Sequence, residues 1–305
     1  MNHGIDTRIR TRIALLTLAF WAIMGKTICA VASESSWAYE AVCAEEAADL
    51  GYDGSGVRIA LLDTGVRESH VVFDGAIIIE GIDYTDTPLG GTRDYIGHGT
   101  FLASILVAQP GNSLGITGLA PGAELIPMKC FDEESAGVSV LAQAIYDAVN
   151  LYDCDIINMS WGVTEDDAVL YAAVEYAYEQ GVILIASAGN DGSSDAVYYP
   201  AAWEQVISVG AVNQNMEISS YSQQNETTWL YAPGDSIYGA GHTSDLADAT
   251  LSGTSYAAAY VTGAAALALQ VAPDLTTEEL MQASATELGD GDYFLNIGAL
   301  IALLT

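Results

Sequence analysis

Residues 251–263 read Leu251-Ser-Gly-Thr-Ser255-Tyr-Ala-Ala-Ala-Tyr-Val-Thr-Gly263 and begin a long segment that is rich in alanine and almost free of charge. The segment ends at Ala272, because Pro273 cannot continue a helix. Such a composition predicts a helix that is buried on nearly all sides. The small residues before Ser255 predict a turn that delivers its hydroxyl to the start of this helix.

Ser255 has two interpretations at this place. Unpaired backbone N–H groups and the positive end of the helix dipole would stabilise an oxyanion formed beside its hydroxyl. The alternative is a serine that only caps a core helix. This segment alone does not decide between them, so the decision depends on residues upstream.

Composition limits the class of protein. The chain has 305 residues, of which 51% are hydrophobic, enough for one large core or two modest ones. It carries 40 acidic residues against 8 Lys and Arg, a net charge of −32. A protein with so few cations cannot neutralise phosphates, which argues against nucleic-acid binding.

The N-terminus has the pattern of an export signal. Arginines within residues 8–12 precede the apolar run 13–24, and Ala30-Val-Ala32 matches a small-residue cleavage pattern. We therefore predict a signal peptide over 1–32 and a secreted or extracytoplasmic domain over 33–305, with no stable membrane span after cleavage. An uncleaved membrane anchor is the alternative, although twelve apolar residues are few for a span.

Three apolar segments predict buried parallel strands that end in polar residues. Val57–Leu62 leads into Asp63, Ile156–Ser160 leads into Trp161-Gly162, and Val182–Ala186 leads into Ser187-Ala-Gly-Asn190. Further strands are predicted near 76–79 and over 124–128 and 206–212, and helices within 33–51 and over 101–108, 139–151 and 168–180. Alternating strands and helices predict one α/β domain, with a mostly parallel sheet flanked by helices on both faces.

Gly97-His98-Gly99-Thr100 enters one of these helices. A lone histidine is more often structural, but here Asp63, His98 and Ser255 occur in one order, each at a strand end or helix start. Functional groups gather at the carboxyl ends of such strands. The order Asp, His, Ser is that of subtilisin.

Four segments, one each for Asp, His, Ser and an amide, resemble motifs of the subtilisin-like serine proteases, the subtilases. The resemblance extends from about Trp37 to the end of the chain. The segments are Ala60-Leu-Leu-Asp63-Thr-Gly65, His98-Gly-Thr-Phe-Leu-Ala103, Gly253-Thr-Ser255-Tyr-Ala-Ala258 and Ser187-Ala-Gly-Asn190.

The resemblance implies a subtilisin-like fold and a serine endopeptidase that acts on peptides or proteins. His98 would take the proton of Ser255 Oγ, and Asp63 would orient the imidazole. Asn190 and the Ser255 N–H would hold the oxyanion. A catalytically silent peptide-binding relative and an esterase with the same triad are the alternatives.

The resemblance also implies where a substrate would bind. Ser160, Trp161 and Gly162 would pair with an extended peptide, and Ala188-Gly189 would form the facing wall of the first specificity pocket. The base of that pocket is often a glycine before a Tyr-Pro pair, where this chain has Tyr198. A ring there predicts a preference for small side chains before the scissile bond, unless Tyr198 points away.

This chain departs from the family at several positions. Ala259 and Tyr260 replace the usual Pro and His. The family's calcium loop resembles 112–116, but Val72 stands where a carboxylate is expected, so we predict no metal ion or other cofactor. No pro-domain fits between Ala32 and Trp37, so the chain folds unaided or a helper or inhibitor is supplied separately.

The cysteines are predicted to be free thiols. Cys43, Cys130 and Cys154 remain after the signal, and an odd number is no disulfide framework. On the family layout, Cys130 and Cys154 lie at opposite ends of neighbouring strands, beyond the ~7 Å Cα limit for a disulfide.

Overall fold

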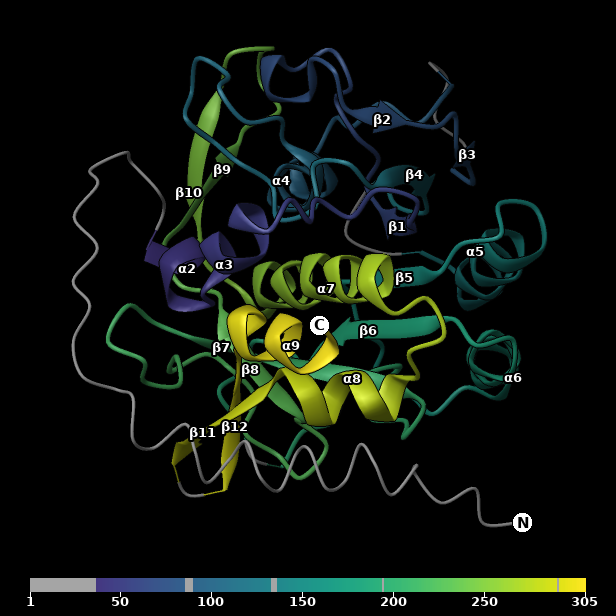
Figure 1. Cartoon of the computed structure of the whole chain (residues 1–305). Helices are drawn as coiled ribbons and strands as arrows, with labels where there is room; N and C mark the ends of the chain where they lie inside the picture. The colour runs from purple at the N-terminus through teal and green to yellow at the C-terminus, as the bar shows by residue number, and fades with distance from the viewer. Residues whose placement is uncertain (1–36, 86–89, 133–135, 194, 290) are drawn as a thin grey trace. The chain divides into compact units, whose positions relative to one another are not determined.

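A mostly parallel sheet forms the centre of the molecule (Figure 1). The computed structural model describes residues 37–85, 90–132, 136–193, 195–289 and 291–305. The predicted signal peptide therefore lies outside the described residues. The strands are β1 Arg58–Asp63, β2 Ile77–Ile78, β3 Ile82–Asp83, β4 Glu124–Lys129, β5 Ile156–Met159, β6 Ile183–Ser187, β7 Val206–Val212, β8 Leu230–Pro233, β9 Ile237–Ala240, β10 Asp248–Leu251, β11 Ala285–Gly289 and β12 Asp292–Leu295.

The strand order in the large sheet is β11-β12-β8-β7-β6-β5-β1-β4-β2, with β3 also pairing with β4. All these pairs are parallel except β11 with β12. Strands β9 and β10 form a separate antiparallel hairpin. Because β6, β5, β1 and β4 are neighbours and run in parallel, the residues after their carboxyl ends share one edge.

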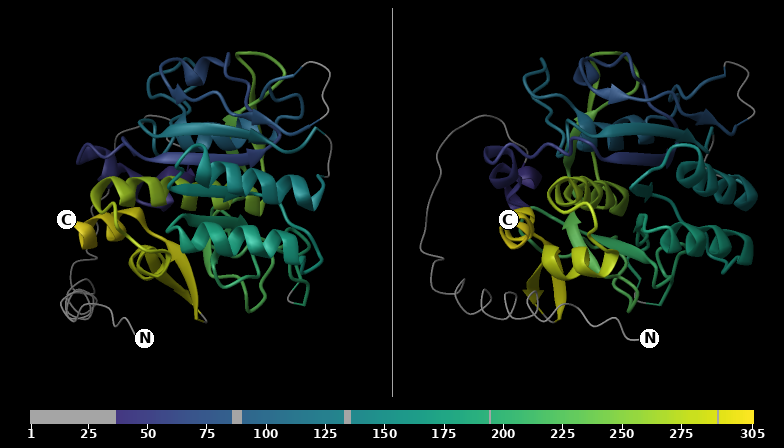
Figure 2. Two further views of the ribbon diagram at one scale, coloured as in Figure 1. Left: turned by 90° about the vertical axis from the view of Figure 1, so that its right-hand side faces the viewer. Right: turned by 45° about the vertical axis from the view of Figure 1, so that its right-hand side comes forward.

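Helices cover both faces of the sheet, as predicted. Helices α4, α7 and α9 contribute to one buried apolar cluster, and α5 and α6 to a second. Figure 2 turns the side of α5 and α6 toward the viewer. The helices are α2 Trp37–Ala41, α3 Ala44–Asp49, α4 His98–Val107, α5 Val138–Asn150, α6 Ala168–Glu179, α7 Thr254–Val271, α8 Thr277–Ser284 and α9 Ile297–Leu304.

The central strands are buried on both faces because successive side chains alternate between the two clusters. In β1, Ile59 and Leu61 belong to the cluster around α7, whereas Ala60 and Leu62 belong to the cluster under α5 and α6. Because neither face of such a strand contacts water, polar and apolar residues need not alternate along it. This explains why β1 reads as a continuous apolar run.

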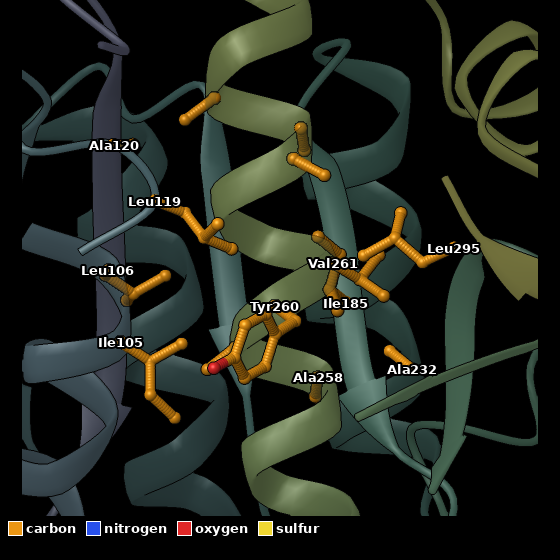
Figure 3. Close-up of a cluster of buried hydrophobic side chains, with 14 of the residues drawn as sticks. Ile105, Leu106, Leu119, Ala120, Ile185, Ala232, Ala258, Tyr260, Val261 and Leu295 are labelled. Carbon is orange, nitrogen blue, oxygen red and sulfur yellow. The ribbon is translucent and has the colours of Figure 1, made fainter. Parts of the chain in front are cut away.

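Helix α7 is covered by the sheet and by helices α4 and α9. Every residue from Thr254 to Leu269 is buried, and the helix packs against α4, α9 and strands β5 to β8. Figure 3 shows Ala258 and Val261 of α7 among buried apolar side chains of other elements. A Cβ on Gly263 would lie 2.6 Å from Leu119 Cβ. Only very small side chains allow neighbours to approach this helix so closely.

The structure confirms the predicted strands and helices up to Val212, with ends that differ by one to three residues. One prediction was wrong in detail. The segment within 33–51 holds two short helices, α2 and α3, because Cys43 between them has a left-handed backbone with φ of 55°. Strands β8 to β12 and helices α8 and α9 were not predicted, since most are four or five residues long and half-exposed or flanked by turns.

The cysteine prediction is confirmed for the described residues, in which Cys43, Cys130 and Cys154 are free. Cys130 follows the carboxyl end of β4, and Cys154 precedes the start of β5. The prediction that these two strands are neighbours was wrong, because β1 lies between them. Burial raises the pKa of Cys154 to about 12, so this thiol is unreactive at neutral pH. In the same described ranges, no helix is both long and apolar enough to cross a membrane.

Candidate active site

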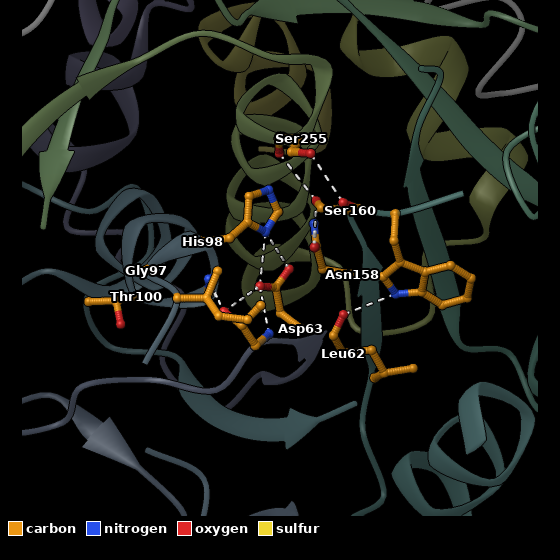
Figure 4. A network of polar contacts seen from close by, with 12 residues as sticks. Leu62, Asp63, Gly97, His98, Thr100, Asn158, Ser160 and Ser255 are labelled. Carbon is orange, nitrogen blue, oxygen red and sulfur yellow. Dashed lines mark hydrogen bonds and ion pairs between the residues drawn. The ribbon is translucent and has the colours of Figure 1, made fainter. Parts of the chain in front are cut away.

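Five segments meet at the carboxyl edge of the sheet, and Figure 4 shows Asp63, His98, Ser160 and Ser255 from four of them. Asp63 ends β1, Ser160 follows β5 and Asn190 follows β6, while His98 and Ser255 lie at the starts of α4 and α7. The parallel sheet brings the three strand ends together, and the two helices point their first turns at the same place. The structure therefore gathers the residues that the sequence analysis selected.

Asp63 and His98 form a close pair. His98 Nδ1 lies 2.8 Å from Asp63 Oδ2 and 2.9 Å from Oδ1. The Asp63 side chain is 3% exposed and that of His98 30% exposed. An ionised carboxylate only accepts hydrogen bonds, so Nδ1 carries the proton and Nε2 of neutral His98 is left as an acceptor. This is the tautomer that a general base requires.

The pKa of His98 is raised above the ordinary value of 6.5. Burial by itself lowers this pKa, because it disfavours the imidazolium. The negative charge of Asp63, its hydrogen bond and the charge of Asp94 all raise the pKa of His98, and together they outweigh the effect of burial. The site therefore stabilises a protonated His98.

Asp94 is a functional candidate that sequence reasoning missed. Its carboxylate is 1% exposed. It accepts hydrogen bonds from the N–H groups of Ile96, Gly97 and Thr100 and from the Thr100 hydroxyl at 2.6–2.9 Å. These bonds fix the first turn of α4 on which His98 stands. The signal was present in the sequence, since an Asp shortly before a helix start is a typical cap.

Ser255 is the second residue of α7, so its backbone N–H has no acceptor within the helix. Its side-chain hydroxyl donates to the Ser160 carbonyl at 3.1 Å. Within the part of the chain that the structure describes, no hydrogen bond joins Ser255 to His98. Hydrogen bonds between catalytic groups are often unformed without substrate.

A buried polar chain links Ser255 to the middle of α7. Ser160 Oγ lies 3.2 Å from the Ser255 carbonyl oxygen and 2.8 Å from Asn158 Oδ1. Asn158 Nδ2 in turn donates to Thr262 Oγ1 at 2.8 Å, and the Thr262 hydroxyl donates to the Ala258 carbonyl. Asn158 and Thr262 are fully buried. This series of hydrogen bonds therefore fixes strand β5 against the turn of α7 that carries Ser255.

Thr254 orients the Asn190 side chain. Asn190 Oδ1 accepts from the Thr254 N–H at 2.9 Å and from the Thr254 hydroxyl at 3.0 Å. Because the amide oxygen is engaged in this way, Nδ2 is the group that can donate to a ligand. The Asn190 Nδ2 and the Ser255 N–H are thus two donors at the start of α7. Sequence reasoning selected Asn190 but missed its anchor.

The residues predicted to bind substrate flank Ser255 from two sides. Ser160, Trp161 and Gly162 follow β5, and Trp161 is fixed by its indole N–H, which donates to the Leu62 carbonyl at 3.0 Å. Ala188 and Gly189 follow β6, with Ala188 buried. Tyr198 lies between these two segments and contacts both.

The loop that resembles a calcium site is held by hydrogen bonds of its own. The Asn112 side-chain amide Nδ2 donates to the Gln109 and Ile116 carbonyls at 2.7 and 2.6 Å. Val72 is buried and offers no oxygen. In the described ranges, no group of three or more His, Cys, Asp or Glu could hold a metal ion. The prediction of no metal stays a prediction.

The sequence of this chain is similar to those of known subtilases. The profile of the Subtilase family matches residues 54–295. The chain is 34% identical to Subtilisin DY of Bacillus licheniformis over 253 residues, 80% of this chain and 89% of that protein. It is 35% identical over 260 residues to the Minor extracellular protease Epr of Bacillus subtilis, 83% of this chain but 38% of that protein.

A solved structure shares the fold. The crystal structure of MycP1 with its N-terminal propeptide removed superposes with a TM-score of 0.76 at 28% identity, covering 89% of this chain and 97% of that one. The fold prediction, a subtilisin-like α/β domain with a mostly parallel sheet, is thereby confirmed.

The opposed effects on His98 can be measured. In an NMR titration of the imidazole, we expect a pKa above 6.5 in the native protein. In Asp63→Asn, the lowering effect of burial meets less opposition, so the pKa of His98 should fall. The reference for both proteins is the pKa of the exposed histidine in the unfolded chain. An unchanged pKa in Asp63→Asn would contradict the role given to this carboxylate.

Proposed function

Because the chain belongs to the subtilase family of serine endopeptidases, we propose that Asp63, His98 and Ser255 form its catalytic triad and that Asn190 donates to the oxyanion. The observation that carries the proposal is the Asp63–His98 pair at 2.8 Å beside the start of α7, which leaves Nε2 of His98 as an acceptor. Each of these residues also lies in a motif that resembles the family's own.

The reaction begins when the Ser255 hydroxyl turns from the Ser160 carbonyl to His98. His98 Nε2 takes the proton as Oγ bonds to the substrate carbonyl carbon. The pair of electrons displaced onto the carbonyl oxygen forms an oxyanion, which accepts from Asn190 Nδ2 and the Ser255 N–H. Asp63 stabilises the imidazolium that results.

Collapse of this intermediate breaks the peptide bond. His98 Nε2 donates its proton to the leaving amine, and an acyl ester on Ser255 remains. A water molecule then attacks the ester carbon while His98 Nε2 takes its proton. Collapse of this second intermediate breaks the bond to Ser255 Oγ, which regains the proton from His98, and the carboxylic acid leaves. The substrate is a peptide or a protein, and no described feature favours the esterase or the silent binding protein over this activity.

We also propose that the enzyme is exported. Support comes from the signal pattern within 1–32 and from the relative whose name describes it as extracellular. N-terminal sequencing of the protein recovered outside the cytoplasm should begin at Ser33. A chain found there with its leader intact would instead indicate the anchored alternative.

The proposed triad predicts the effect of Ser255→Ala. Incubation of the wild-type protein with a diverse peptide library should give cut sites that mass spectrometry identifies. Ser255→Ala should give none above background, because the nucleophile is lost, although a residual rate about 10³-fold over water is expected from the remaining groups. The same cut sites at the same rate in Ser255→Ala would refute the mechanism.

The hydrogen bonds that link Thr262 to Ser255 through Asn158 and Ser160 predict that Thr262 affects kcat. Thr262→Val has nearly the same shape but leaves Asn158 Nδ2 buried without its acceptor. Displacement of Ser160 and Ser255 should lower kcat by about 10–10²-fold with little change in KM. Thr262→Ser keeps the hydroxyl and serves as the matched control, with near wild-type kcat. Equal kcat values in the two variants would show that this chain does not position Ser255.

A further inference from the structure

If the proposed function is right, the position of the catalytic groups determines where the side chain of the substrate residue before the scissile bond binds. The carbonyl carbon must lie at Ser255 Oγ and its oxygen at Asn190 Nδ2, while the Ser160 carbonyl faces the other side of Ser255. The two segments after β5 and β6 therefore flank the substrate residue. Its side chain has to enter the slot between Gly162 of one segment and Gly189 of the other.

The ring of Tyr198 already occupies this slot. A Cβ built on Gly162 would lie 2.9 Å from Tyr198 Cβ and 3.4 Å from Cδ1. A Cβ built on Gly189 would lie 2.6 Å from Tyr198 Cδ2 and 2.9 Å from Cε2. Opposite edges of one ring thus contact the two glycines. The ring therefore faces the space between these two glycines, where it is half-buried.

The position of Tyr198 is fixed by its surroundings. Its hydroxyl donates to the Asp191 carboxylate, one residue after Asn190. The next residue, Tyr199, pairs with Val163 through two backbone hydrogen bonds of 2.8 Å. The Tyr198 carbonyl accepts from the Ala202 N–H at 2.8 Å. A swing of the ring out of the slot would break the bond to Asp191 and work against this anchored backbone.

The segment before Tyr198 is also anchored. The side-chain amides of Gln223 and Asn225 donate to the Ala196 carbonyl at 3.1 and 2.6 Å. Gln223 Oε1 accepts from the Ser193 N–H at 2.8 Å, and Gln223 itself is fully buried. The loop that carries Tyr198 is thus tied to the body of the domain on both sides of the ring.

We propose that Tyr198 fills the first specificity pocket and restricts the residue before the scissile bond to a small side chain, such as Gly, Ala or Ser. A phenyl or isobutyl group would need the volume that the phenol ring occupies. The Asp191 carboxylate at the rim adds repulsion against Asp or Glu at the same substrate position.

The test compares peptides that differ only at that position, carrying Ala, Ser, Leu, Phe or Arg. The wild-type enzyme should have its highest kcat/KM with Ala or Ser. Tyr198→Gly should raise kcat/KM for Phe and Leu relative to Ala by about 10–200-fold, because the slot is emptied. Tyr198→Phe, the matched control, keeps the ring and should keep the preference for Ala over Phe. Thermal melting and fluorophosphonate labelling of each variant establish that it is folded and active.

Two outcomes would overturn the inference while leaving the proposed triad in place. One is a wild-type enzyme, reactive with fluorophosphonate, that cuts best after Phe, Leu or Arg. The other is a folded and labelled Tyr198→Gly variant whose ratio of Phe to Ala cleavage equals that of the wild type. Absence of both cleavage and labelling in the wild-type protein would overturn the proposed function and this inference together.

Discussion

Burial of helix α7 on every side is the constraint on which the rest of the structure depends. Alanine, glycine and threonine make up most of α7, and its larger side chains, such as Tyr256 and Leu267, are buried as well. Its packing against strands β5 to β8 fixes its position on the sheet. Its first turn therefore lies at the carboxyl edge, where Asp63, Ser160 and Asn190 also lie.

The same constraint explains why the helix contains polar residues at certain positions. Thr254 holds Asn190, and Thr262, two turns later, holds Asn158 of the neighbouring strand. A buried hydroxyl is costly unless it is paired, and the hydroxyls of both threonines are hydrogen-bonded. In this way the core helix both fills the interior and orients the groups around Ser255.

Much of this arrangement could be predicted from the sequence, and the reasons are physical. A strand buried on both faces, such as β1, has a clear apolar pattern, and Asp63 stands out at its end. Short strands such as β10 carry no such pattern, because four half-exposed residues give no apolar run and their conformation depends on pairing with β9. Asp94, Asn158 and Thr262 were missed for a related reason, since a polar residue shows its partner only in three dimensions. The direction of the Tyr198 ring likewise depended on glycines in two other segments.

The central claim is that Ser255 is a nucleophile activated by His98. Its most direct test is the reaction of the full chain with a fluorophosphonate, followed by peptide mapping of the adduct. We expect one adduct, on Ser255, at a rate that falls by several orders of magnitude in His98→Ala. An adduct on another residue, or labelling of Ser255 that is as fast in His98→Ala as in the wild-type protein, would contradict the account.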